Sequence, residues 1–229
     1  DREEIKQVAA IVRAVNTVDI CFLLDCTITM EPWRKKVLED VHSIVEETSK
    51  EYSDCVIRIG FVGYTDDECK QKLHVLDFTT SIENFKKYVN GIVCEKSDDY
   101  AEDVVSGLEA VIDLSWSAQE KFMFHICDAP CHGRKFHNFW NFSANDRFPN
   151  ADPTERLKIV FKRFEQLKLK YCFIKINDTT DIMVKKFSEM LDPAQCSIEV
   201  MPLGENTKQF QAAVVASVGH AHQQQTHKK

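Results

Sequence analysis

The chain has 229 residues, 44% hydrophobic and 28% charged, a composition typical of globular proteins. Its formal net charge of −7 argues against broad binding to nucleic acids or anionic membranes, because both need a basic surface. No apolar run approaches the roughly 18 residues of a membrane span, and the first residues lack the pattern of a signal peptide.

The cysteines indicate a reducing compartment. They number nine, an odd count, and have no repeated spacing. Four lie in or at the ends of apolar runs, where free cysteine behaves as a small hydrophobic residue: Cys21, Cys26, Cys127 and Cys172. Cys127, Cys131 and His132 could suggest a zinc site, but the two cysteines are one loosely spaced pair without a second pair, so the evidence for zinc is weak. We therefore expect reduced thiols in a cytoplasmic protein.

The first half of the chain predicts helix, strand, helix and hairpin in turn. Residues 1–17 contain an amphipathic helical pattern, and residues 18–25 form a continuous apolar run, as in a strand buried on both faces. Residues 32–50 have apolar positions at helical spacing after a proline suited to a first turn. Residues 54–65 and 72–79 are strand-like and joined by a polar turn.

The second half alternates between helix and strand. Helices are predicted over 81–91, 101–114, 153–170, 180–191 and 207–218, and strands over 121–128, 171–177 and 196–203. This alternation predicts an α/β fold: a doubly wound, mostly parallel sheet of about six strands with helices on both faces. We expect one domain over 18–218 and a disordered tail over 219–229.

Two apolar runs end in aspartate, at Asp25 and Asp128. If both strands are parallel, both carboxylates emerge at the same sheet edge, where sites of open α/β sheets gather. Thr27 and Thr29 add hydroxyl groups beside Asp25. Between these segments lies an acidic group before a helix: Asp98, Asp99, Glu102 and Asp103. Acidic residues also favour helix N-termini, and Asp99 suits an N-cap.

Several carboxylates brought together repel one another unless a cation or a proton lies among them. Oxygen ligands select hard cations such as Mg2+, Mn2+ or Ca2+. Because hydroxyl ligands add no charge, such a cation would remain electrophilic and accept a carboxylate from another molecule. The pattern therefore predicts binding through a metal.

Three motifs resemble those of von Willebrand factor A domains: DCTITM at 25–30, SDDYAEDVVSGLEAV at 97–111 and CDAPCHG at 127–133. The likeness covers residues 18–218 and is greatest to the A domains found with alpha-type protein kinases. Carried over by position, it implies a metal site of Asp25, Thr27, Thr29, Asp99 and Asp128. It further implies a non-enzymatic, cytoplasmic protein-binding module that uses Mg2+, Mn2+ or Ca2+. A partner would supply an acidic residue, and a kinase domain would lie in the same or an associated chain.

Two alternatives stay open. Asp-x-Thr-x-Thr after a strand also resembles haloacid-dehalogenase phosphotransferases, in which Asp25 would be a nucleophile and Lys175 the phosphate-binding lysine. Alternatively, the domain is a scaffold with a decayed metal site, since Ile28 replaces a frequent glycine and the middle motif lacks paired glycines.

Residues 134–149 form an insertion rich in aromatic residues. Phe136, Phe139, Trp140 and Phe142 suggest a satellite core or, alternatively, a partner surface. His74 and His125 lie in apolar runs and are expected to be core or edge residues, whereas His132 and His137 lie near the predicted site.

Overall fold

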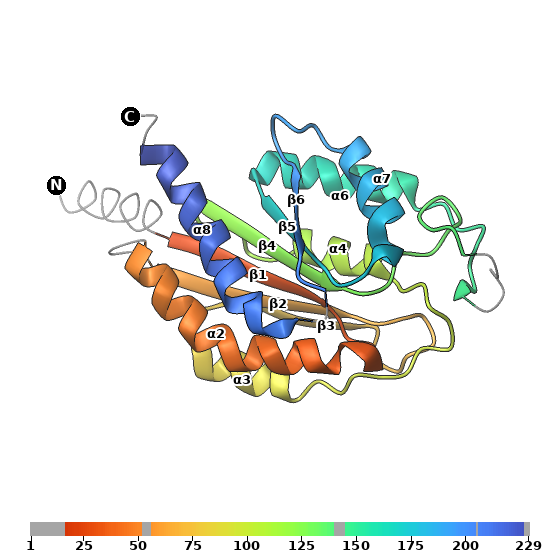
Figure 1. Ribbon diagram of the computed structural model, residues 1–229, viewed down its shortest axis with the longest axis horizontal. Helices are drawn as coiled ribbons and strands as arrows, with labels where there is room; N and C mark the ends of the chain where they lie inside the picture. Colours follow the sequence, from red (N-terminus) through yellow and green to blue (C-terminus); the bar gives the residue numbers. More distant parts are fainter. Residues whose placement is uncertain (1–16, 52–55, 140–144, 205, 227–229) are drawn as a thin grey trace.

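The computed structural model of the chain describes residues 17–51, 56–139, 145–204 and 206–226 (Figure 1). The predicted N-terminal helix, Trp140 and Phe142 lie outside these ranges.

A six-stranded sheet forms the centre, in the order β3-β2-β1-β4-β5-β6. Its strands are β1 (Thr17–Asp25), β2 (Val56–Tyr64), β3 (Leu73–Thr79), β4 (Glu120–Cys127), β5 (Lys170–Lys175) and β6 (Ile198–Pro202). All neighbouring strands pair in parallel except β2 and β3, which form the antiparallel hairpin. The predicted fold class is therefore confirmed.

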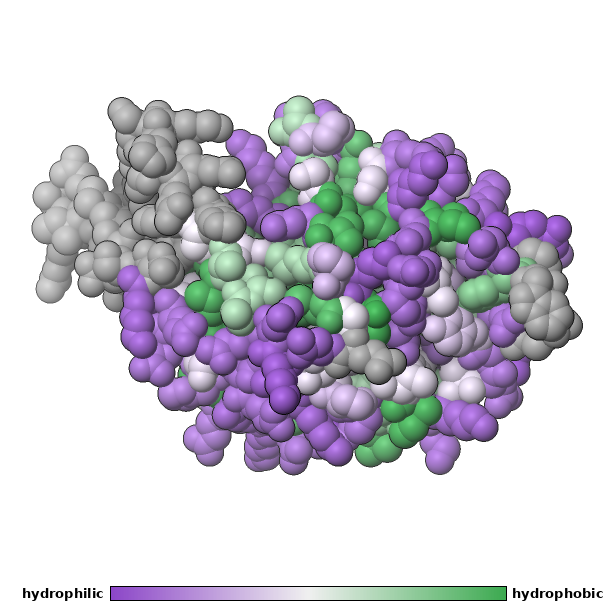
Figure 2. Space-filling view, in the orientation of Figure 1, coloured by the Kyte–Doolittle hydropathy of each residue, from purple (hydrophilic) through white to green (hydrophobic). Residues whose placement is uncertain are grey.

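Helices cover both faces of this sheet (Figure 1). One layer contains α2 (Glu31–Glu51), α3 (Ile82–Asn90) and α8 (Phe210–Thr226). The other contains α4 (Val104–Ile112), α6 (Thr154–Leu167) and α7 (Asp181–Met190). Figure 2 shows mostly hydrophilic residues on the outer side of α2, as expected for an amphipathic surface helix. Among the helices of the described ranges, none has the length and apolar character needed to cross a membrane.

The central strand β1 contributes to both hydrophobic cores. Phe22 and Leu24 face the core beneath α2, whereas Cys21 and Leu23 face the core beneath α4. Successive side chains of a strand point to opposite faces, so a strand covered on both sides is apolar throughout. This burial explains the continuous apolar run in the sequence and fixes the position of Asp25 at its end.

Two helix boundaries differ from the prediction. The helix expected over 101–114 begins at Val104, and its N-cap is Asp103, which accepts from the Ser106 amide, rather than Asp99. Glu102 is in a parallel bridge with Cys131, and its amide donates to the Pro130 carbonyl, so this backbone is extended instead of helical. At the C-terminal end, helix α8 continues beyond residue 218 to Thr226, into the segment expected to be a disordered tail.

Gly107 determines how closely α4 packs on the sheet. A Cβ at this position would lie 2.5 Å from Tyr64 Cδ1 and 3.2 Å from Leu23 Cδ1. We expect Gly107→Ala to lower the free energy of unfolding by about 1–3 kcal/mol through overpacking, measured by urea denaturation. At Gly91 the nearest atom to a new Cβ is 3.3 Å away, so Gly91→Ala should change stability much less. Equal losses in the two variants would contradict this explanation.

Candidate metal centre

The loop after β1 presents a buried carboxylate with one oxygen free of hydrogen bonds. Asp25 is fully buried. The Thr27 amide and hydroxyl donate to Asp25 Oδ1 at 2.8 and 2.6 Å. Asp25 Oδ2 is buried and has no hydrogen-bond partner among the described residues. A buried carboxylate oxygen without a donor is costly, and a cation would satisfy it.

Asp128 follows β4 at the same edge of the sheet and lies near Asp25. The Thr29 hydroxyl donates to its carboxylate. Its backbone carbonyl accepts hydrogen bonds from Tyr100 Oη at 2.9 Å, Asn177 Nδ2 at 2.9 Å and Thr179 Oγ1 at 2.8 Å. The sequence analysis did not identify these three supporting residues. Two of them could have been found, because Asn177 and Thr179 follow the end of β5 and therefore lie at the same edge of the sheet as Asp25 and Asp128.

The electrostatics of this group favour a positive ligand. Burial and the nearby charge of Asp128 raise the pKa of Asp25 to about 7, although hydrogen bonds from Thr27 oppose this rise. Burial also raises the pKa of Asp128, against the Thr29 hydrogen bond. A buried carboxyl, a half-buried carboxyl and two hydroxyls therefore form a donor set that fits a hard divalent cation. The exposure of Thr29 leaves the group accessible to another molecule.

The structure brings together Asp25, Thr27, Thr29 and Asp128, whereas the contacts of Asp99 are with other residues. The Asp99 carboxylate accepts from the Arg147 amide, faces the Asp66 carboxylate and lies 4.0 Å from His132. Burial, together with Asp66, raises the pKa of Asp99 to about 6. The role of Asp99 as a ligand of the same cation stays a prediction.

Asp99 belongs to a neighbouring group that we call the acidic cluster: Asp66, Glu68, Asp99, His132 and Asp146. His132 joins two of its carboxylates, with Nε2 2.8 Å from Asp66 Oδ1 and Nδ1 2.9 Å from Asp146 Oδ1. Burial would lower the pKa of His132, but these two hydrogen bonds outweigh it and raise the pKa to about 9. His132 is therefore an imidazolium at neutral pH.

Glu102 lies next to both groups and increases the density of acidic side chains. It is almost fully buried, and its Oε2 atom has no hydrogen-bond partner within the described part of the chain. Burial first, and then the charges of Asp25, Asp66 and Asp99, raise its pKa to about 11. Glu102 is therefore neutral at physiological pH.

The described part of the insertion over 134–149 contributes one aromatic ring to the core and leaves another at the surface, so its role as a partner surface stays a prediction. Phe136 is buried and packs edge-on against Phe187, with ring centroids 6.0 Å apart, within the main core beneath α4, α6 and α7 instead of a satellite core. Phe148 remains 39% exposed above the His132 ring, at 5.0 Å. An aromatic side chain is thus available at the surface beside the acidic cluster.

The remaining candidate residues have structural contacts. His125 is fully buried between Tyr64 and Tyr171, and His74 is also buried, as expected of core histidines. The Lys175 ammonium pairs with Asp178 at 2.8 Å and Asp181 at 2.6 Å. The eight cysteines of the described ranges are free and buried.

A doubly wound sheet with hydroxyl and carboxylate side chains at the carboxyl ends of β1 and β4 defines the von Willebrand factor A class. The chain belongs to this family: the model of the von Willebrand factor A domain matches residues 19–141. Such domains are protein-interaction modules, generally non-enzymatic, and commonly bind a divalent metal.

Among curated proteins, the chain is 30% identical over 193 residues to the alpha-protein kinase vwkA of Dictyostelium discoideum. That match covers 83% of this chain but only 29% of the relative. Among solved structures, the open form of the pilus adhesin SpaC from Lactobacillus rhamnosus GG has a TM-score of 0.58 at 10% identity, over 90% of this chain and 30% of that one. The SpRpn10 VWA domain has a TM-score of 0.50 at 11% identity, over 86% of this chain and 94% of that one. At these identities the two structures show the fold alone.

Proposed function

We propose that this domain binds a protein partner through a divalent cation held by Asp25, Thr27, Thr29 and Asp128. The cation would be Mg2+, Mn2+ or Ca2+, because all the side-chain donors are oxygens. The partner would supply an Asp or Glu that completes the coordination shell. The observation that best supports this proposal is the buried Asp25 Oδ2 atom, which has no hydrogen-bond partner among the described residues.

The cellular context is part of the same proposal. The relative named alpha-protein kinase is much longer than this chain, so we place a kinase domain in the same chain or in an associated one. A cytoplasmic location is supported by the free, buried state of the eight described cysteines, since reduced thiols persist in that compartment. The domain itself acts by binding, without a catalytic residue.

The test is thermal unfolding in EDTA and in Mg2+, Mn2+ or Ca2+, for the wild type and Asp25→Asn. A cation that binds only the folded state should stabilise the wild type by about 2.7 kcal/mol at a hundredfold excess over its dissociation constant. The Asp25→Asn variant should lose most of this cation-dependent gain. The matched control is Asp178→Asn, because Asp178 follows β5 at the same edge but its side chain is 92% exposed.

A wild type that gains no stability from any of the three cations would contradict the metal site and favour the decayed scaffold. The partner chemistry is tested separately by selecting random peptides on the domain in Mg2+ and eluting them with EDTA. We expect every recovered peptide to need an Asp or Glu, so peptides that bind without one would contradict the proposed recognition.

A further inference from the structure

The acidic cluster contains a second set of oxygen atoms spaced for a metal ion. One carboxylate oxygen from each of Asp66, Glu68 and Asp99 lies within 4.8 Å of the others. Asp66 and Glu68 come from the turn between β2 and β3, and Asp99 comes from the segment before α4. Oxygen ligands 2.0–2.6 Å from one Mg2+, Mn2+ or Ca2+ ion lie at roughly such separations from one another.

Acidic groups are common on protein surfaces, but two carboxylates of this one are buried and incompletely paired. The third, Glu68, is 20% exposed and accepts hydrogen bonds at both of its oxygens. The Asp66 side chain is fully buried and that of Asp99 is 4% exposed. Asp66 Oδ2 and Asp99 Oδ1 have no hydrogen-bond donor within the described part of the chain. The two carboxyl groups nevertheless lie within hydrogen-bonding range of each other. Two facing carboxylates need a cation or a shared proton between them.

The surrounding groups hold the three carboxylates in place and leave Asp66 Oδ2 and Asp99 Oδ1 available to a ligand. His132 occupies the other oxygen of Asp66 at 2.8 Å. The Arg147 guanidinium binds Glu68 Oε2 at 2.6 Å, and the Arg147 amide donates to Asp99 Oδ2. Each ligand is therefore positioned by a neighbour, as is usual for side chains around a metal.

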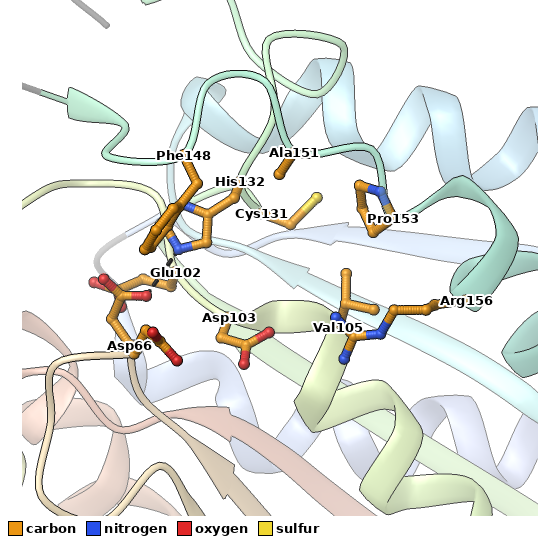
Figure 3. A pocket seen from close by; sticks show the side chains of 11 residues that line it. Asp66, Glu102, Asp103, Val105, Cys131, His132, Phe148, Ala151, Pro153 and Arg156 are labelled. Carbon is orange, nitrogen blue, oxygen red and sulfur yellow. Dashed lines mark hydrogen bonds and ion pairs between the residues drawn. The ribbon is translucent and has the colours of Figure 1, made fainter. Parts of the chain in front are cut away.

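A pocket of about 200 Å³ provides access to Asp66 (Figure 3). In Figure 3, Asp66, Glu102 and His132 lie together at one end of this pocket, away from Arg156. The carboxylates that line it, Asp66, Asp67 and Asp103, outnumber the cationic groups, His132 and Arg156, while Glu102 is neutral. The wall therefore keeps a negative balance, which attracts a hydrated cation.

We propose that Asp66, Glu68 and Asp99 bind a second divalent cation, separate from the cation at Asp25 and Asp128, so that Asp99 belongs to this second site instead of the first. His132 is a positioning residue that orients Asp66 through its hydrogen bond. This site connects the turn after β2 with the segment before α4, and through Arg147 it also contacts the insertion.

The test counts bound Mn2+ by the electron paramagnetic resonance signal of the free ion, after the full chain has been stripped with EDTA. We expect two ions per wild-type chain and one each for Asp66→Asn and Asp25→Asn. The double variant should bind none. Asp67→Asn is the matched control, because Asp67 lines the same pocket but has a side chain 56% exposed and paired with Lys72. It should keep both ions.

Glu68→Gln provides a second variant in case Asp66→Asn fails to fold, since the Glu68 side chain is 20% exposed. We expect Glu68→Gln to raise the dissociation constant of the second Mn2+ ion at least tenfold. If the wild type binds a single ion and Asp25→Asn loses it, the proposal is overturned. A proton shared between Asp66 and Asp99 would then explain their facing carboxyl groups. Retention of both ions by Asp66→Asn and Glu68→Gln would overturn it as well. Loss of one ion in Asp66→Asn but none in Asp25→Asn would instead support this site and contradict the proposed function.

Discussion

Replacing Asp146 by alanine is expected to lower the free energy of unfolding by about 3–5 kcal/mol. Asp146 is fully buried and accepts four hydrogen bonds. The amides of Gly133 and Phe148 donate at 2.9 and 2.8 Å, and the rings of His132 and His137 lie at 2.9 and 2.7 Å. Burial would raise the pKa of Asp146, but these hydrogen bonds outweigh it and lower the pKa. Truncation would leave the amides of Gly133 and Phe148 without this acceptor, and the His132 imidazolium would keep Asp66 alone of its two carboxylate partners.

Urea denaturation at pH 7 measures this loss. The control is Asp98→Ala, which also removes a carboxylate near the insertion but one whose side chain is 71% exposed and paired with Arg147. An exposed pair of this kind contributes about 0–1 kcal/mol. A loss in Asp146→Ala no larger than that in Asp98→Ala would show that Asp146 does not organise the insertion.

Lowering the pH from 6.5 to 4 is expected to remove about 3 kcal/mol of stability through His125 alone. Burial lowers the pKa of His125 to about 3, and its ring nitrogens contact Tyr64 Oη at 3.1 Å and Tyr171 Oη at 2.8 Å. In the unfolded chain the same group has a pKa of about 6.5. Between these values the unfolded state binds a proton that the native state excludes. The contribution of His125 is therefore complete above pH 6.5 and decreases as the pH falls toward 3.

The measurement compares the pH dependence of unfolding free energy for the wild type and His125→Gln between pH 4 and 7. The variant should show a shallower dependence, by up to about 1.4 kcal/mol per pH unit. His42→Gln is the control, since the His42 side chain is 63% exposed, and it should keep the wild-type slope. Proton resonances of the His125 ring should not titrate above pH 5 in the native protein. A native titration near pH 6.5 would contradict the effect of burial.

The sequence determined the sheet and the meeting of Asp25, Thr27, Thr29 and Asp128 at one of its edges. The apolar run of β1 indicated a strand covered on both faces, and its burial beneath α2 and α4 confirms that interpretation. Asp25 and Asp128 each end such a run, so a parallel arrangement was enough to predict their meeting at one edge. Thr27 and Thr29 follow Asp25 within four residues, and local geometry alone keeps them near it.

Only the tertiary structure decided which side chains the loop residues Asp99 and His132 contact. Asp99 was expected beside Asp25 or as an N-cap, but its contacts are with Asp66, His132 and Arg147. The pairing of His132 with Asp66 spans 66 positions in the chain. Periodicity and strand direction are local properties that fix where strand ends lie. The partner of a loop side chain instead depends on how several loops fold over one another, and no spacing in the sequence encodes that arrangement.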